Sequence, residues 1–457
     1  MGKGLGAFLI GLLLASAVWY YTERILIPYQ QGSRDSSLQG NFSDLYPRWL
    51  GARELLLHGS NPYSTDVTRE IQQGYYGRPL DRQRAADPKD QQRFAYPLYV
   101  VFLLAPTIVF PFAKVQAAFG MSLLVLTLFS IWLWASALRL KFAASHALLF
   151  TALLLGSYPM VQALHLQQLS LLVAFVIAAS MASLVNGNLI PAGTLLALAT
   201  IKPQLVLPLV ACCAIWSLGN WRERYRFALS FCATMALLVI GAELLLPGWM
   251  EHFIDAVVAY REYAGTDSIA DLLLTHRGGP TAATLLAIAT VGVCWWFRKE
   301  PAGSVAFSAI IAGVLAVTLV IMPTIAPYNQ VLLVPGLMLL LDQRGRIWAL
   351  GRFARCMYRA SFVLVAWPWV TALVLDLAST MVPAARVQTA WPVPLYTSIW
   401  IPVVVLICLL LLISALAKRA EPAAPIATIV AIEQLAAPQF RGPYVAPEVT
   451  DFRCQEW

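Results

Sequence analysis

Long apolar stretches recur along the chain, separated by short polar or basic segments. A helix needs roughly 17–25 mainly apolar residues to cross about 30 Å of hydrocarbon. The alternating segments of about ten residues that are typical of a membrane β-barrel are absent. The pattern therefore predicts an all-α polytopic membrane protein. We expect about twelve spans, near residues 7–22, 116–138, 143–158, 168–185, 189–201, 203–219, 227–247, 281–297, 303–322, 329–342, 360–380 and 396–417.

The composition agrees with this class. Of the 457 residues, 59% are hydrophobic and only 12% are charged, whereas soluble domains carry about 25% charged residues. The net charge of +8 does not indicate a nucleic-acid partner, because Lys and Arg of membrane proteins gather in cytoplasmic loops. The seven cysteines have no metal-ligand spacing and suggest no disulfide framework. Phosphate-loop, dinucleotide and zinc-helix motifs are absent, so nucleotide-dependent chemistry has no support.

The first apolar run contains a small-residue sequence at 15–17 that resembles a signal-peptidase site. It ends, however, in Trp19, Tyr20 and Tyr21, and aromatic residues of this kind anchor helices at the membrane interface. We therefore expect a retained span rather than a cleaved signal peptide.

Segment 94–112 is apolar enough to be another span but contains Pro97, Pro106 and Pro111. An interior proline removes a helical hydrogen bond and kinks or breaks the helix. We expect this segment to be re-entrant or to lie along the membrane face.

Charge supports that interpretation. If 94–112 does not cross and the N-terminus is cytoplasmic, four basic residues of the loops after the span at 116–138 fall outside: Lys202, Arg261, Arg277 and Arg386. The cytoplasmic side then receives fourteen, which are Arg139, Lys141, Arg222, Arg224, Arg226, Arg298, Lys299, Arg344, Arg346, Arg352, Arg355, Arg359, Lys418 and Arg419. A crossing segment would invert this distribution, against the positive-inside rule.

We accordingly expect both termini in the cytoplasm and one membrane domain, 1–420, with an outer loop and its juxtamembrane helices at 23–115. A flexible cytoplasmic tail, 421–457, follows it. The polar segments then meet on the outer face, so we expect the chemistry there. These segments are 23–93, 94–112, 157–168, 201–204, 248–280 and 322–330.

Asp44 is the first candidate for chemistry. It precedes a predicted helix that would end at Gly59, so Ser43 or Asp44 could simply cap that helix. Alternatively, an ionised carboxylate could accept the proton of an acceptor hydroxyl while a glycosidic bond forms. The two roles are compatible.

Lys202 is the second candidate. It interrupts two apolar segments and is followed by Pro203, which would break a helix there. Ionisable residues at membrane depth are costly and usually functional. A lipid-linked phosphate is the preferred partner, and snorkelling to the interface is the alternative.

Other polar residues lie near predicted outer helix ends. We assign His165 and Arg261 to donor-phosphate binding and the rest to sugar or acceptor binding; ordinary helix contacts, solvated charge and a simple turn are the alternatives. The sugar or acceptor set is Gln167, Gln168, Tyr328, Asn329, His276 and Arg277. No cofactor is expected, and metal dependence is left open because no acidic pair is convincingly spaced for a divalent ion.

The order of these motifs resembles glycosyltransferase family 87, polyprenyl-phosphate-sugar-dependent membrane enzymes of the GT-C superfamily. The motifs are "SDLYPRWLGARELLLHGSNPY", "FAYPLYVVFLLAPTIVFPF", "HLQQLSLLV", "ALATIKPQLVLPLV" and "APYNQVLLVPGLMLL", and the likeness covers roughly residues 5–345. The family includes α-mannosyltransferases and an arabinofuranosyltransferase that build lipid-linked glycans.

The resemblance implies a GT-C-type fold, Asp44 as catalytic base and Lys202 in the donor site. It also implies an inverting transferase that moves a sugar, with mannose favoured, from a polyprenyl-phosphate donor to a glycan or glycolipid acceptor. Such an enzyme would contribute to the cell envelope from the inner membrane, with its active site on the extracytoplasmic side. The alternative from another class is a polytopic transporter or lipid flippase without transferase activity, although no internal repeat supports it.

Overall fold

The computed structural model describes residues 2–28, 38–81, 83–84, 87–141, 144–264, 267–390 and 392–420. The chain divides into two compact units, Met1–Ser414 and Ala415–Trp457, and the helical bundle belongs to the first. The predicted tail at 421–457 lies outside the described residues. No strand occurs within the described ranges, as expected for an all-helical membrane protein.

The elements up to the middle of the chain alternate between long apolar helices and short ones near polar segments. They are α1 (Gly2–Tyr21), the π-helix η1 (Thr22–Leu26), α3 (Tyr46–His58), α4 (Thr65–Tyr76), α5 (Val100–Leu104), the 3-10 helix η2 (Ala105–Thr107), α6 (Phe112–Ala137), α7 (Ala144–Leu155), α8 (Tyr158–His165), α9 (Leu169–Val185), α10 (Leu189–Ala199) and α11 (Pro203–Gly219).

The later elements follow the same pattern. They are α12 (Trp221–Leu245), α13 (Trp249–Ala264), α14 (Ile269–Trp296), α15 (Val305–Ile321), the 3-10 helix η3 (Pro327–Leu333), α16 (Val334–Asp342), α17 (Arg344–Ala349), α18 (Arg352–Ser379), α19 (Ala384–Gln388), α20 (Pro392–Ser398) and α21 (Ile401–Ala420).

Each stretch predicted to span the membrane contains a helix. Among the described residues, six helical segments are long and apolar enough to cross by themselves. The number is seven if α7 and α8, which are bent by 57° at their junction, form one span. Helices α9, α10, α11 and α15 are apolar but shorter. The chain is therefore a multi-pass membrane protein, and the count of about twelve spans and the sidedness of the termini stay predictions.

The proline-rich segment 94–112 forms only the short helices α5 and η2 before α6 begins. At 1.5 Å per residue, the five residues of α5 extend over about 7.5 Å, too little to cross the hydrocarbon. Pro106 lies within η2, and Pro111 immediately precedes α6, where a missing backbone N–H is tolerated. The prolines thus separate short helices instead of kinking one long helix.

Several basic loops meet at one end of the bundle. Arg224 of α12 donates from Nη1 to the carbonyl oxygens of Trp216 (2.6 Å) and Arg298 (2.7 Å). Gly303 faces the guanidinium of Arg139 so closely that a Cβ there would lie 2.4 Å from its Cζ. The connections after α6, α11 and α14 therefore lie at the same end.

The first residues of α6 lie at the opposite end. Phe112 packs against the rings of Tyr46 and Trp49 in α3, with centroid separations of 4.8 and 5.2 Å. Helix α6 has 26 residues, which corresponds to about 39 Å at 1.5 Å per residue. One helix thus separates the basic loop at Arg139 from the α3 region by a distance comparable to a bilayer.

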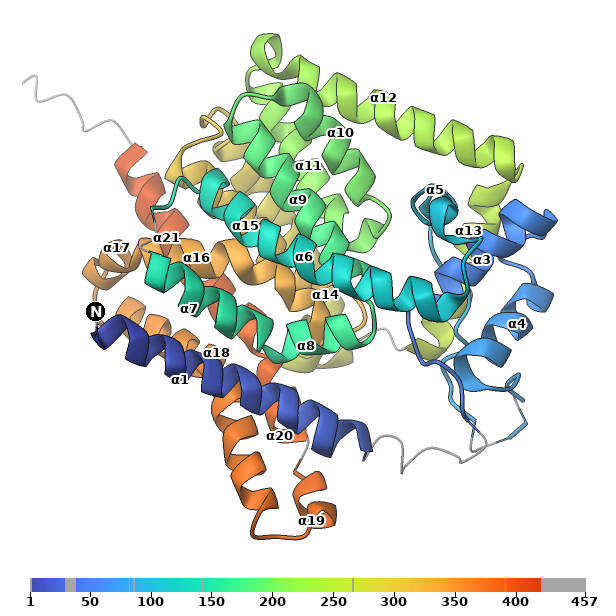
Figure 1. Cartoon of the computed structure of the whole chain (residues 1–457). Coiled ribbons are helices and arrows are strands. Elements are labelled where there is room, and N and C mark those ends of the chain that lie inside the picture. The colour runs from blue at the N-terminus through green and yellow to red at the C-terminus, as the bar shows by residue number, and fades with distance from the viewer. Residues whose placement is uncertain are drawn as a thin grey trace, which may run out of the picture. The chain divides into compact units, whose positions relative to one another are not determined.

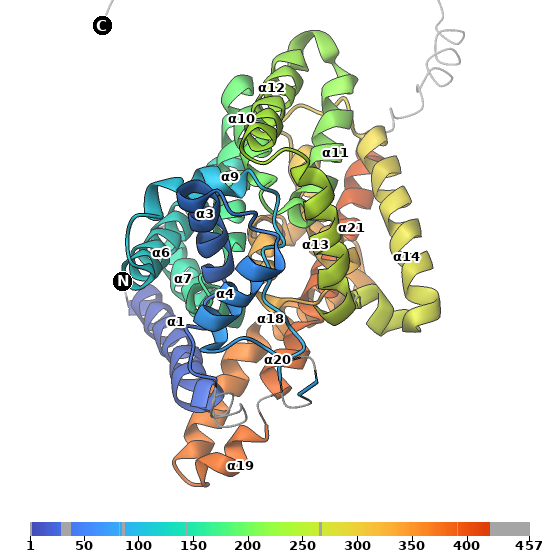
Figure 2. The same ribbon diagram turned by 90° about the vertical axis from the view of Figure 1, so that its right-hand side faces the viewer.

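Helices α3, α4, α5 and α13 gather beyond this second end, on the right in Figure 1 and towards the viewer in Figure 2. Ser64 caps the start of α4, because its hydroxyl accepts a hydrogen bond from the Val67 amide. Helix α3 ends at His58 and is followed by Gly59, whose left-handed φ of 70° agrees with the predicted stop signal. This group of helices and the adjacent helix ends hold most of the candidate residues together.

Candidate functional site

Asp44 lies just before α3, where its carboxylate points to other elements rather than capping the helix. Its Oδ1 accepts a hydrogen bond from the Tyr75 hydroxyl of α4 at 3.2 Å. Its Oδ2 accepts one from the side-chain amide of Gln168. The N-terminal residue flanking α3 is Leu45, without a side-chain cap, and the Ser43 hydroxyl accepts from the Leu45 amide instead. Helix capping therefore does not account for the carboxylate.

The backbone holds Asp44 against the α8–α9 turn. The Asp44 amide donates to the carbonyl oxygen of Leu166 at 3.1 Å. Gln167 in this turn has a φ of 49°, an uncommon conformation for a residue other than glycine. Its side-chain oxygen accepts hydrogen bonds from Ser43 (2.7 Å) and Gln116 (3.1 Å). Gln167 thus ties the Asp44 loop to α6 and α8.

Lys202 occupies the break between α10 and α11, as the sequence predicted. Its side chain is only 4% exposed, so it does not snorkel to the surface. The ammonium donates to the side-chain oxygen of Gln168 at 2.9 Å and to the Ser170 hydroxyl at 2.7 Å. Gln168 therefore contacts Asp44 through its amide nitrogen and Lys202 through its amide oxygen.

Two further predicted residues join this network from η3. The Ser170 hydroxyl donates to Oδ1 of Asn329 at 2.7 Å. The Lys202 ammonium lies 5.1 Å from the centroid of the Tyr328 ring, within the range of a cation–π interaction. Segments that are far apart in sequence thus meet around one buried lysine.

Arg48 is the main residue that the sequence reasoning missed. One helical turn after Asp44, it donates from Nη1 to the Asp44 carbonyl oxygen, and its guanidinium lies 4.3 Å from the centroid of the Tyr96 ring. It interacts electrostatically with Asp44, Lys202 and Tyr328. The available signal was the spacing of four residues between an acid and an arginine at the start of a predicted helix.

Burial and charge act in opposite directions on Asp44. Removal from water disfavours the ionised carboxylate and raises its pKa, and this is the largest effect. The positive charges of Arg48 and Lys202 and the hydrogen bonds from Tyr75 and Gln168 lower it, which leaves a net pKa above the ordinary value for aspartate. A carboxylate tuned this way suits proton acceptance better than a fully solvated one.

The remaining predicted site residues lie away from this network or outside the described residues. His165 pairs with Glu23 at 3.7 Å on the surface. Arg261 in α13 and Arg277 in α14 are exposed. The side chain of His276 lies outside the described residues. Tyr260, which the sequence did not single out, is the residue of α13 that interacts electrostatically with Asp44 and Arg48.

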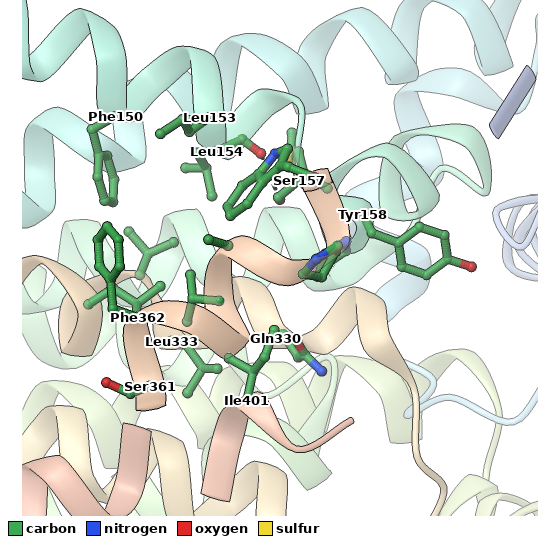
Figure 3. A pocket seen from close by; sticks show the side chains of 18 of the residues that line it. Phe150, Leu153, Leu154, Ser157, Tyr158, Gln330, Leu333, Ser361, Phe362 and Ile401 are labelled. Carbon is green, nitrogen blue, oxygen red and sulfur yellow. Dashed lines mark hydrogen bonds between the residues drawn. The ribbon is translucent and has the colours of Figure 1, made fainter. Parts of the chain in front are cut away.

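An apolar cavity of about 400 Å³ lies among α1, α7, α8, η3, α16 and α18. Gln330, adjacent to Asn329, lines it and donates its side-chain amide to the Ser398 carbonyl oxygen at 2.8 Å. Figure 3 shows Tyr158 and Gln330 at one end and Phe150 and Phe362 at the other. Phe362 is 62% exposed, so the cavity reaches the apolar outer surface. Its mainly apolar lining suits an apolar ligand.

A metal site is not evident in the part of the chain that the structure describes, which holds no group of three or more His, Cys, Asp or Glu side chains able to bind an ion. The arrangement instead offers a half-buried carboxylate as proton acceptor, the buried cation of Lys202 and the half-buried cation of Arg48, several amides and hydroxyls, and an apolar cavity.

The comparison with known families gives one match. The model of glycosyltransferase family 87 matches residues 94–323, half of the chain, and thereby confirms the resemblance seen in the sequence motifs. The matched region contains Gln168, Ser170 and Lys202, whereas Asp44 and Asn329 lie outside it. No curated protein and no solved structure matches the chain.

Proposed function

This chain belongs to glycosyltransferase family 87, and from that premise we propose that it transfers a sugar from a polyprenyl-phosphate donor to a glycan or glycolipid acceptor. Membership of this family identifies the protein as a membrane glycosyltransferase. The donor class, mannose as the favoured sugar, inversion at the anomeric carbon and a role in the cell envelope are parts of the proposal. The contact of Asp44 and Lys202 with one amide, Gln168, is the observation that carries it.

In the proposed reaction Asp44 is the general base. As the acceptor oxygen attacks the anomeric carbon, its proton passes to the Asp44 carboxylate. The bond between the anomeric carbon and the phosphate oxygen breaks on the opposite face, and its electron pair leaves with the polyprenyl phosphate. One displacement from the back inverts the anomeric configuration.

Lys202 contributes on the leaving-group side. The phosphate gains negative charge as the bond breaks, so a fixed cation stabilises the transition state more than the bound donor. The Lys202 ammonium is held by Gln168 and Ser170 rather than by a carboxylate, which leaves its charge available to an anion. A phosphate leaving group of this kind needs no strong acid.

The lipid-linked donor is supported by the apolar cavity next to Asn329. A polyprenyl chain in that cavity would place its phosphate towards the polar network. Gln330, which lines the cavity, adjoins Asn329, and Asn329 accepts from Ser170 beside Lys202.

An extracytoplasmic active site is supported by charge. The site lies at the end of α6 opposite the basic loop at Arg139, and basic loops face the cytoplasm by the positive-inside rule. We therefore place the protein in the inner membrane as a multi-pass protein.

The test is a transfer assay. Purified full-length protein is incubated with radiolabelled polyprenyl-phosphate mannose and a crude lipid acceptor, with Asp44→Asn protein as the matched control. Labelled glycolipid from the wild type alone supports the proposal. If no polyprenyl-phosphate sugar yields a product, and the reconstituted protein moves lipid between the two leaflets of vesicles, the flippase alternative would be favoured.

A further inference from the structure

We propose that Arg48 and Lys202 form a two-cation site for the phosphate of the donor, and that this site favours the phosphomonoester product over the phosphodiester substrate. The inference rests on the proposed function and assigns a role to Arg48, a residue that the motifs did not indicate.

Both cations lack a carboxylate partner at contact distance. The ion pairs found among the described residues, with a limit of 4.0 Å, include neither Arg48 nor Lys202. Lys202 is held by an amide and a hydroxyl, and Arg48 by a backbone carbonyl and the Tyr96 side chain. The Nε of Arg48 is buried and has no hydrogen-bond partner. Buried charges are normally paired or bound to an ion, so this arrangement suits the binding of an anion.

Each cation also lies against an aromatic ring, Arg48 on Tyr96 and Lys202 on Tyr328. A cation–π contact stabilises and orients a cation without neutralising it. Since Arg48 and Lys202 interact electrostatically with each other, the two rings hold like charges in one region. That is unfavourable unless a negative group binds between or beside them.

Asp44 supplies only one negative charge to this pair. It interacts electrostatically with both cations, so the three residues carry a net charge of about +1 when ionised. Asp90 is the other carboxylate in electrostatic range of Arg48. Its Oδ1 and Oδ2 already accept hydrogen bonds from the amide and side chain of Gln92, both at 2.9 Å. Asp90 is not among the groups that act on Lys202, and neither Asp44 nor Asp90 is in a direct ion pair with Arg48 or Lys202 among the described residues, so both cations can still contact an anionic ligand.

The charge of that ligand changes during the proposed reaction. A sugar polyprenyl phosphate is a phosphodiester with one negative charge. Once the sugar has left, the polyprenyl phosphate is a monoester whose second ionisation, near pH 6 for such esters, brings its charge towards two at neutral pH. A site with two cations matches the later state better than the earlier one, so it stabilises the developing charge in the transition state.

Arg53 provides an internal comparison. It lies in the same helix, faces the Trp49 ring at 5.5 Å and likewise has a buried Nε without a partner. It is not among the groups that interact electrostatically with Asp44 or Lys202. If replacing Arg53 weakens phosphate binding as much as replacing Arg48, the loss comes from a change in structure and not from a lost phosphate contact.

The experiment measures binding without transfer, so it stays informative if the transferase assay fails. Farnesyl phosphate, its methyl diester and farnesol are titrated into the purified full-length wild type and the Arg48→Ala, Arg48→Lys and Arg53→Ala variants. Size-exclusion elution and thermal unfolding identify any variant that does not fold.

We expect Arg48→Ala to lower the affinity for farnesyl phosphate by about tenfold or more. The affinity for the methyl diester should fall by less, and the affinity for farnesol should not change. A tenfold change corresponds to one lost contact of about 1.4 kcal/mol. Arg48→Lys should recover part of the affinity, and Arg53→Ala should bind like the wild type. Equal losses in Arg48→Ala and Arg53→Ala, an equal loss for farnesol, or wild-type protein that binds farnesol as tightly as farnesyl phosphate would each overturn the proposal.

Discussion

The carboxylate of Asp44 and the ammonium of Lys202 contact the same side chain, since Gln168 donates to Asp44 and accepts from Lys202. An amide bridge holds opposite charges near each other while preventing their direct contact. A direct ion pair would engage both groups with each other, whereas the bridge leaves faces of each for a substrate. Transfer should therefore depend on the bridge and on both groups that it joins.

Asp44→Asn should abolish transfer while leaving the fold and donor binding intact. The amide keeps the size and hydrogen-bonding ability of the side chain but cannot accept the acceptor proton, and loss of a general base costs about 10²–10⁴ in rate. Transfer kinetics and donor binding are measured on the same preparation. Wild-type turnover in this variant would remove Asp44 from the mechanism.

Gln168→Leu should lower kcat strongly with a smaller effect on acceptor KM. The substitution leaves the Asp44 and Lys202 side chains without their shared partner, and a hydrogen bond to a charged group contributes about 1.5–3 kcal/mol. We therefore expect a decrease in kcat/KM of roughly 10- to 150-fold. A loss confined to thermal stability, with kcat preserved, would make the bridge purely structural.

Lys202→Ala should weaken use of the donor more than use of the acceptor. It removes the buried cation proposed to stabilise the phosphate and leaves Ser170 bonded to Asn329. Donor and acceptor are varied separately in steady-state assays. Unchanged donor kinetics would be incompatible with a phosphate-binding role.

The helix pattern and the two central residues could be predicted from the sequence because their signals are local. Apolar length predicts the helices, a proline after a lone lysine predicts the break at Lys202, and an acid before a helix start indicates Asp44. The burial of Lys202, which is 4% exposed, contradicts the alternative in which its side chain snorkels to the interface.

The partners of these residues could not be predicted, because they depend on which helix ends meet in space. Ser170 reads as one more small residue in the apolar helix α9, yet it connects Lys202 to Asn329. Tyr75 belongs to no motif that the sequence analysis singled out in the outer loop, yet it donates to Asp44. We grouped His165 with Gln168 because they are three residues apart. In the structure His165 is the last residue of α8, and its side chain pairs with Glu23.

Activity should depend on the ionisation of Asp44 with an acid limb above the range of an ordinary aspartate. Burial raises its pKa overall, and the charge of Arg48 opposes that increase. Because the base must be deprotonated, activity should increase as pH rises through this pKa. Arg48→Ala removes a positive charge, so the pKa of Asp44 should rise further and the limb should move to higher pH.

The profile of kcat/KM against pH checks this sign, with Arg53→Ala as the control that should keep the wild-type profile. A limb that stays in place or moves to lower pH in Arg48→Ala would mean that Arg48 does not act on the charge of Asp44.

The apolar cavity should select for the lipid chain of the donor. Leu337→Trp places a larger side chain on α16, in the lining of the cavity. In the wild type we expect a lower KM for a long polyprenyl donor than for a short citronellyl donor, and the variant should lose this difference. The phosphate and sugar contacts lie outside the cavity, so kcat with the short donor should change little. Leu237→Trp is the matched control, because Leu237 is 73% exposed on α12 and does not line the cavity. If both variants retain the preference for long chains, the donor lipid binds elsewhere; if both lose it, the effect comes from the added tryptophan and not from the cavity.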